Sequence, residues 1–125
     1  MFKNVLIVGL GGFLGSVSRY ITTLYMHKFF PVSFPIGTFT VNIIGCFLIG
    51  LFYGIADKGS LMSAEWRMFL TVGFCGGFTT FSTFAYDNLG LLRDQEMFYS
   101  ALYIGISVTL GLLMAYLGSW LIKLI

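Results

Sequence analysis

Hydrogen-bonding side chains recur at helical spacing inside apolar segments of this sequence. Asn42 follows Thr38 by four residues and Ser107 follows Tyr103 by four, so each pair shares one helical face. An amide or hydroxyl is costly in an apolar environment unless it is hydrogen-bonded. Asn42 therefore either binds a neighbouring helix or offers N–H donors to a small anion, and both interpretations stay open. Ser107 alone is weak support for either, because a serine hydroxyl often bonds its own backbone.

The segment Gly73–Phe84 (GFCGGFTTFSTF) combines glycines, hydroxyl residues and phenylalanines within one apolar stretch. Glycine lowers helix propensity, and threonine and serine compete for backbone hydrogen bonds, so we predict a break in the helix here. Irregular backbone at membrane depth is tolerated only where protein or a water-filled cavity satisfies it, so the break predicts a site. Unwound carbonyls in broken membrane helices can also coordinate Na⁺.

Phe81 and Phe84 share one face of the helix that follows the predicted break. The edge of a phenylalanine ring is electropositive and suits a small anion that has lost its water. The face of the ring would suit a cation instead. The sequence leaves the orientation of both rings open.

Membrane helices must position these residues. The chain of 125 residues is 58% hydrophobic and only 10% charged, whereas a soluble domain has about a quarter of its residues charged. A span needs about 20 apolar residues, so the chain has room for four spans and no soluble catalytic domain. We therefore predict an all-α membrane protein that is not an enzyme. The net charge of +2 is too small to argue for a nucleic-acid partner.

The hydropathy pattern predicts one membrane domain over residues 1–125. Ser63 is the expected N-cap before the third span, with Glu65 in its first turn. Cys46 and Cys75 fall within spans, and we interpret them as small buried residues rather than a disulfide. The four spans are expected at about 5–26, 37–56, 67–92 and 97–121.

Basic residues are distributed almost evenly between the two ends of the predicted bundle. The end with both termini carries Lys3, Lys58, Arg67 and Lys123, and the other end carries Arg19, Lys28 and Arg93. Such a small bias allows a single weakly preferred orientation, or insertion in both orientations with antiparallel pairing. Four spans hardly enclose a pathway alone, so we expect oligomers in either case. Arg19 either snorkels past the end of its helix or lends positive potential to an aqueous vestibule.

Three motifs together resemble the CrcB/Fluc family of fluoride channels. They are Gly11–Tyr20 (GGFLGSVSRY), Gly37–Gly45 (GTFTVNIIG) and Gly73–Phe84, which occur in the family's order within a chain of matching length. The resemblance implies an antiparallel, dual-topology homodimer in a microbial plasma membrane. It also implies two separate pores that export fluoride passively and so lower its toxicity, each pore using residues from both subunits.

The resemblance also implies roles for individual residues. Asn42 corresponds to the pore-lining amide, and Phe81 and Phe84 to the pore's aromatic pair. Arg19 corresponds to an arginine near the vestibule. Gly111 departs from the pattern, because a hydroxyl is expected one turn after Ser107. The residues that correspond to the polar track of the pore are Ser82, Thr83, Tyr103 and Ser107. The residues whose backbone carbonyls correspond to a central structural Na⁺ site are Gly76 and Thr79.

Two alternatives predict different behaviour. A small proton-coupled exporter of similar size and dual topology would take up organic cations in response to pH, but it usually needs a buried acid near mid-membrane. The only carboxylate near a span interior is Asp87, toward the end of the third span. A structural subunit without transport activity would show no ion flux.

Overall fold

The computed structural model describes residues 1–125, and its regular structure is entirely helical. Three of its helices are long and uninterrupted: α1 (Phe2–Phe29), α2 (Ile36–Ala56) and α6 (Met97–Lys123). The remaining segment, Ala64–Arg93, is divided into four elements. They are α3 (Ala64–Met68), the π-helix η1 (Phe69–Cys75), α4 (Gly76–Phe78) and α5 (Phe81–Arg93).

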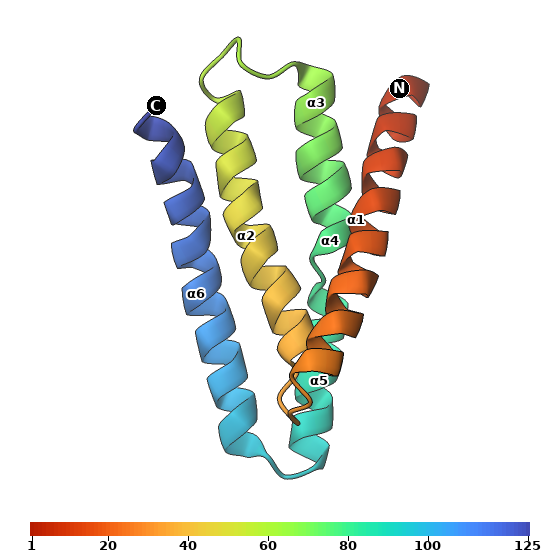
Figure 1. Ribbon diagram of the computed structural model, residues 1–125, viewed down its shortest axis with the longest axis vertical. Coiled ribbons are helices and arrows are strands. Elements are labelled where there is room, and N and C mark those ends of the chain that lie inside the picture. Colours follow the sequence, from red (N-terminus) through yellow and green to blue (C-terminus); the bar gives the residue numbers. More distant parts are fainter.

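The prediction of four long apolar helices is confirmed. Each of the segments Phe2–Phe29, Ile36–Ala56, Ala64–Arg93 and Met97–Lys123 is long and apolar enough to cross a membrane. Both termini and the α2–α3 connection lie at one end of the bundle, and the other two connections lie at the opposite end (Figure 1). The helices run a few residues beyond most of the expected span limits.

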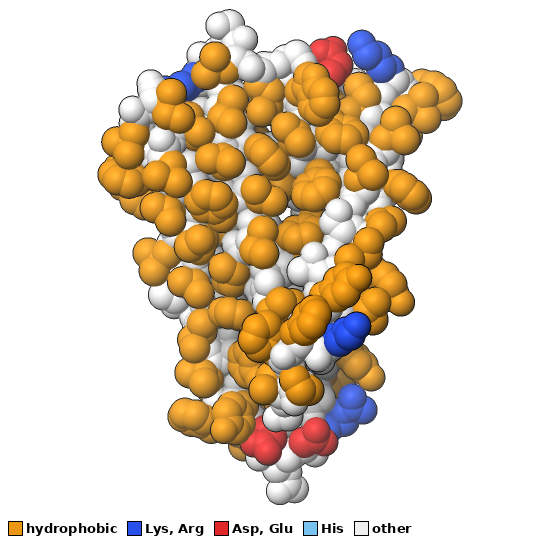
Figure 2. All heavy atoms as spheres, viewed as in Figure 1, with side chains coloured by type: hydrophobic (Ala, Val, Ile, Leu, Met, Phe, Trp, Pro, Cys, Tyr) orange, Lys and Arg blue, Asp and Glu red, His pale blue; other side chains and the backbone are white.

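The outer surface of the bundle is apolar. Only 17 of the 125 residues are buried, and large apolar side chains such as Phe13, Leu112 and Tyr116 are mostly exposed. Figure 2 shows hydrophobic side chains over most of one face, with acidic side chains only at its two ends. A soluble monomer rarely exposes so large an apolar area, so this surface is suited to lipid and to other membrane helices.

Small residues bring α1 against the third segment. A methyl group at Gly11 would overlap the carbonyl oxygen of Phe69, and one at Gly15 would overlap that of Phe74. The pair α2 and α6 packs equally closely, since a methyl at Gly50 would meet the Ala115 backbone. Such backbone contact is how membrane helices gain packing energy without a hydrophobic driving force.

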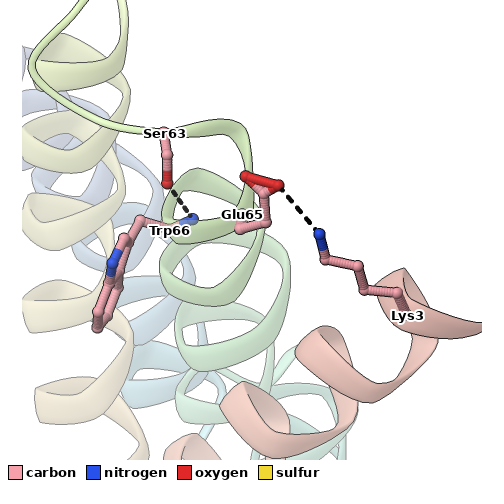
Figure 3. A network of polar contacts seen from close by, with 4 residues as sticks. All are labelled: Lys3, Ser63, Glu65 and Trp66. Atoms are coloured by element: carbon pink, nitrogen blue, oxygen red, sulfur yellow. Dashed lines mark hydrogen bonds and ion pairs between the residues drawn. The ribbon is translucent and has the colours of Figure 1, made fainter.

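The predicted N-cap of the third segment is also confirmed. The Trp66 amide donates to Ser63 Oγ over 3.2 Å, which satisfies one unpaired N–H of the first turn (Figure 3). Beside it, Lys3 Nζ lies 3.5 Å from Glu65 Oε2, joining the start of α1 to α3. Both side chains of this ion pair are largely exposed, so it contributes little to stability.

Candidate functional site

The backbone is extended at two consecutive residues of the third segment. Thr79 has φ −90° and ψ 161°, and Thr80 has φ −152° and ψ 122°, between the end of α4 and the start of α5. The Thr80 hydroxyl accepts from the Thr83 amide over 3.1 Å and so caps α5. Threonine suits this position because its side chain supplies the hydrogen bond that the missing turn of helix would have made.

The Asn42 side chain bonds both backbone groups of Thr80. The Thr80 amide donates to Asn42 Oδ1 over 2.8 Å, and Asn42 Nδ2 donates to the Thr80 carbonyl over 3.1 Å. The amide therefore replaces the helical partners that an extended residue lacks. One of its two N–H groups is used in this pairing, which leaves one for another acceptor.

Arg19 is also bonded to this region. Its Nε donates to the carbonyl oxygen of Gly77 over 3.0 Å, across 58 residues of sequence, and its side chain is half-buried. The guanidinium thus lies against the third segment, a contact that its position in the sequence does not predict. The positive charge of the guanidinium therefore lies close to the extended residues, and its other N–H groups are further donors.

Two carbonyl groups next to the extended residues lose their helical donors. In a continuous helix the amides of Thr80 and Thr83 would bond the carbonyls of Gly76 and Thr79. Those amides instead bond Asn42 Oδ1 and Thr80 Oγ1. Gly76 is also exposed on the side of the bundle. Free carbonyl oxygens are the ligands that a hard cation prefers, so the residues present fit a Na⁺ site.

A groove of about 260 Å³ lies beside the extended residues, and we call it the aromatic groove. It brings together four of the residues expected to line the pore: Asn42, Phe81, Phe84 and Ser107. The ring centroids of Phe81 and Phe84 are 5.8 Å apart at an interplanar angle of 40°. Phe81 is 79% exposed, so one side of the groove opens onto the surface of the chain. The full lining is Asn42, Cys46, Thr79, Thr80, Phe81, Phe84, Ser107 and Val108.

Tyr103 lies behind this groove rather than in its lining. It is fully buried, and its hydroxyl donates to Asp87 Oδ2 over 3.1 Å. Its ring centroid lies 4.8 Å from that of Phe84 and 5.1 Å from that of Phe34. Tyr103 therefore supports Phe84 from behind, and its hydroxyl hydrogen is engaged by Asp87.

Ser82 and Thr83 also lie outside the lining of the aromatic groove. Ser82 is exposed, and its Oγ lies 3.3 Å from the Thr80 hydroxyl. Thr83 takes part in the local network through its backbone amide. Both belong to the first turn of α5, two and three residues after Thr80.

A buried polar pair that the sequence did not predict lies next to Phe84. Asn88 Nδ2 donates to the Phe84 carbonyl over 2.9 Å, and Ser100 Oγ donates to Asn88 Oδ1 over 2.9 Å. Both side chains are buried and join α5 to α6. The signal was available in part, because Ser100 lies three residues before Tyr103 on the same face of its helix.

These features define a polytopic membrane protein with a polar and aromatic groove on the side of its helix bundle. The chain belongs to the family described as CrcB-like protein, Camphor Resistance (CrcB), whose sequence model matches residues 6–119. With four helices suited to cross a membrane and bacterial relatives throughout, it is a multi-pass microbial membrane protein.

Its relatives align along nearly the whole chain. The fluoride-specific ion channel FluC of Chlorobaculum tepidum is 49% identical over 124 residues, which is 99% of this chain and 98% of the relative. The protein of the same name from Flavobacterium psychrophilum is 46% identical over 93% of this chain and 94% of its own length. That of Leptospira interrogans is 40% identical over 97% and 95%.

Proposed function

We propose that this protein is a fluoride-selective passive channel that exports fluoride from the cytoplasm and so lowers its toxicity. The observation that carries the proposal is the aromatic groove, which joins Asn42, Phe81, Phe84 and Ser107 in one cavity. The proposal is supported by relatives named fluoride-specific ion channels at 40–49% identity over nearly the full length.

The chemistry of the groove suits a small anion. Fluoride is strongly hydrated and a strong hydrogen-bond acceptor, so a pathway must offer donors that replace its water. The free N–H of Asn42, the Ser107 hydroxyl and the electropositive ring edges of the two phenylalanines can supply them. No charged side chain lines the groove. A neutral lining avoids trapping the ion, and conduction requires that it leave as readily as it enters.

The remaining residues of the proposed pathway lie outside the lining of the aromatic groove. Ser82 and Thr83 extend the polar track along α5, Tyr103 supports this track from α6 by packing behind Phe84, and Arg19 attracts anions to the vestibule by its charge. Arg19 also positions the Gly77 carbonyl in this scheme.

We place the channel in the plasma membrane as an antiparallel homodimer whose chains insert in both orientations. The near-equal basic charge at the two ends supports this arrangement. Further support is that Phe81 and Gly76 are exposed, so a second chain is needed to close the pathway. A two-fold axis in the membrane plane would give two equivalent pores.

A structural Na⁺ on that axis is the proposed ion for the carbonyls of Gly76 and Thr79. These two oxygens from each chain would supply four ligands, and their usual helical donors bond other acceptors. When bound, the ion offsets the repulsion between converging carbonyl dipoles of the two chains. The chain itself would contribute only backbone oxygens to this site. The neighbouring carbonyls of Thr80 and Gly77 are not proposed as ligands, because they accept hydrogen bonds from Asn42 and Arg19.

Flux through liposomes tests the function. The purified protein should pass fluoride rapidly and chloride hardly at all when both are measured side by side. Comparable chloride flux would overturn the proposal. Uptake of organic cations driven by a pH gradient would support a proton-coupled exporter instead, and absence of any flux would support a structural subunit.

A further inference from the structure

The two cysteines of the chain line a second groove, which shares Asn42, Cys46 and Thr79 with the aromatic groove. This groove, of about 260 Å³, is here called the thiol groove, and its lining includes Cys46, Cys75, Thr71, Thr79 and Gly76. Cys46 comes from α2 and Cys75 from the end of η1, and neither forms a disulfide. The chain contains no other cysteine.

Two hydroxyl groups of the thiol groove present lone pairs rather than hydrogens. The Thr71 hydroxyl donates to the Arg67 carbonyl over 2.7 Å, and the Thr79 hydroxyl donates to the Cys75 carbonyl over 2.9 Å. Because each hydroxyl hydrogen points back along its own helix, each hydroxyl oxygen is left as an acceptor. The Gly76 carbonyl has also lost its helical donor to Asn42. These three oxygens suit an electron-pair acceptor such as a cation, while Asn42 is the one side-chain amide N–H donor in the lining.

The sulfur atoms set the class of cation. Thiol sulfur is a soft ligand and favours soft metal ions, whereas carbonyl and hydroxyl oxygens favour hard ones. Cys75 is 4% exposed and Cys46 is half-buried, so both sulfurs lie in surroundings of low polarity. A neutral complex with a monovalent ion fits such surroundings better than a charged complex with a divalent ion.

Cys46 also reaches the proposed fluoride pathway. It lines the aromatic groove together with Phe81, Phe84 and Ser107. Its Sγ lies against α6 at Gly111, where an added methyl group would come within 3.2 Å of the sulfur. The absence of a side chain at Gly111 thus leaves the space that the Cys46 thiol occupies between α2 and α6.

We propose that Cys46 and Cys75 bind one soft monovalent cation of the Ag⁺ and Cu⁺ class in the thiol groove, and that the bound ion blocks the channel. Ag⁺ forms a bond to Cys46 Sγ while the S–H bond breaks, and the proton leaves to water. The Cys75 thiol donates a sulfur lone pair and keeps its proton, so the complex carries no net charge. Block follows because Cys46 is shared with the aromatic groove; this consequence alone rests on the proposed function.

Binding is tested on the purified full-length protein with Ag⁺ as the probe in chloride-free buffer. Native mass spectrometry and titration with a silver electrode should give one Ag⁺ per chain for the wild type. Cys46→Ser and Cys75→Ser should each weaken binding by at least an order of magnitude, and the double variant should bind none. Equal binding by the double variant would place Ag⁺ elsewhere and overturn the proposal. Wild-type affinity in either single variant would reduce the site to one thiol and overturn it as well.

Block is tested separately by fluoride efflux from liposomes, each variant being compared with its own rate without Ag⁺. Ag⁺ should stop wild-type efflux, dithiothreitol should restore it, and the double variant should be insensitive. Stoichiometric binding with unchanged efflux would overturn the block. Two-thiol binding by a protein that passes no fluoride even without Ag⁺ would leave the metal site standing and remove the proposed function. If Cys75→Ser does not fold, as judged by size-exclusion chromatography, Cys46→Ser alone decides the test.

Discussion

At the scale of single residues, the side chains around the extended segment divide between holding the backbone and facing the aromatic groove. Asn42 does both, because its pairing with Thr80 uses the carbonyl oxygen and one N–H and leaves one N–H free. Phe81 makes few contacts within the chain, since it is 79% exposed. Replacing Phe81 therefore tests the proposed contribution to permeation, whereas replacing Asn42 also tests the structural contribution.

Replacing Phe81 by isoleucine should impair permeation and leave folding intact. Isoleucine keeps apolar bulk but lacks the electropositive ring edge, so we expect fluoride flux to fall about tenfold or more, equivalent to about 1.4 kcal/mol. Flux is measured in liposomes with a fluoride electrode, and the oligomeric state by size-exclusion chromatography. Unchanged flux would remove this ring from the pathway.

Replacing Asn42 by leucine should destabilise the protein itself. Leucine has a similar volume but leaves the amide and carbonyl of Thr80 without partners, at a cost of about 1–3 kcal/mol for each buried group. The unfolding temperature in detergent should fall clearly. Thr40→Val is the matched control on the same helix, because the Thr40 hydroxyl bonds only the Ile36 carbonyl of its own helix. Equal unfolding temperatures for the two variants would contradict the structural role of Asn42.

At the scale of elements, close helix packing positions the extended segment. The α1 helix lies against η1 and α4 through Gly11 and Gly15. Arg19, one turn after Gly15, then reaches the Gly77 carbonyl. The position of the extended residues relative to α1 therefore depends on a contact that tolerates no side chain.

Gly15→Ala should disrupt this contact. The added methyl would overlap the Phe74 carbonyl oxygen, and overpacking of this kind costs about 1–3 kcal/mol. Gly9→Ala is the control, because nothing lies within 4 Å of the added methyl there. Thermal unfolding in detergent should show a lower midpoint for Gly15→Ala and an unchanged or higher one for Gly9→Ala. A similar midpoint for both variants would mean that α1 moves away at no cost.

The elements also show what a sequence reveals about this fold. The number of long apolar helices follows from length and hydropathy. The predicted break in Gly73–Phe84 stays a prediction, and the two extended residues, Thr79 and Thr80, lie within that segment. The π-helical turn of η1 was not predicted, because an i→i+5 bond pattern has no strong residue preference. The pairings Asn42–Thr80 and Asn88–Ser100 depend on which helices become neighbours, and single-sequence periodicity does not contain that information.

At the scale of the whole molecule, one chain presents an apolar exterior with two grooves and an exposed Gly76. The proposed Na⁺ site joins two such chains, so removing Na⁺ should weaken the dimer or its conductance. Replacing Na⁺ by N-methylglucamine, a cation too large for the carbonyl cage, tests this. The monomer fraction is measured by crosslinking, and flux in liposomes. Indifference of both measurements to Na⁺ would count against the central site.

Orientation in the membrane provides the last test, because the antiparallel pair exists only if the chain inserts both ways. In a thiol-free background, Ile125→Cys places a label at the exposed carboxyl end, next to Lys123. A membrane-impermeant maleimide added to spheroplasts should label about half of the molecules, since the basic residues scarcely favour either orientation.

Adding Asp57→Lys, which raises the positive charge at the end that holds both termini, should retain that end in the cytoplasm and abolish labelling. The same change should reduce fluoride export, because chains of one orientation cannot form the antiparallel pair. Complete labelling or none in the parent, together with normal export, would show that a single orientation suffices.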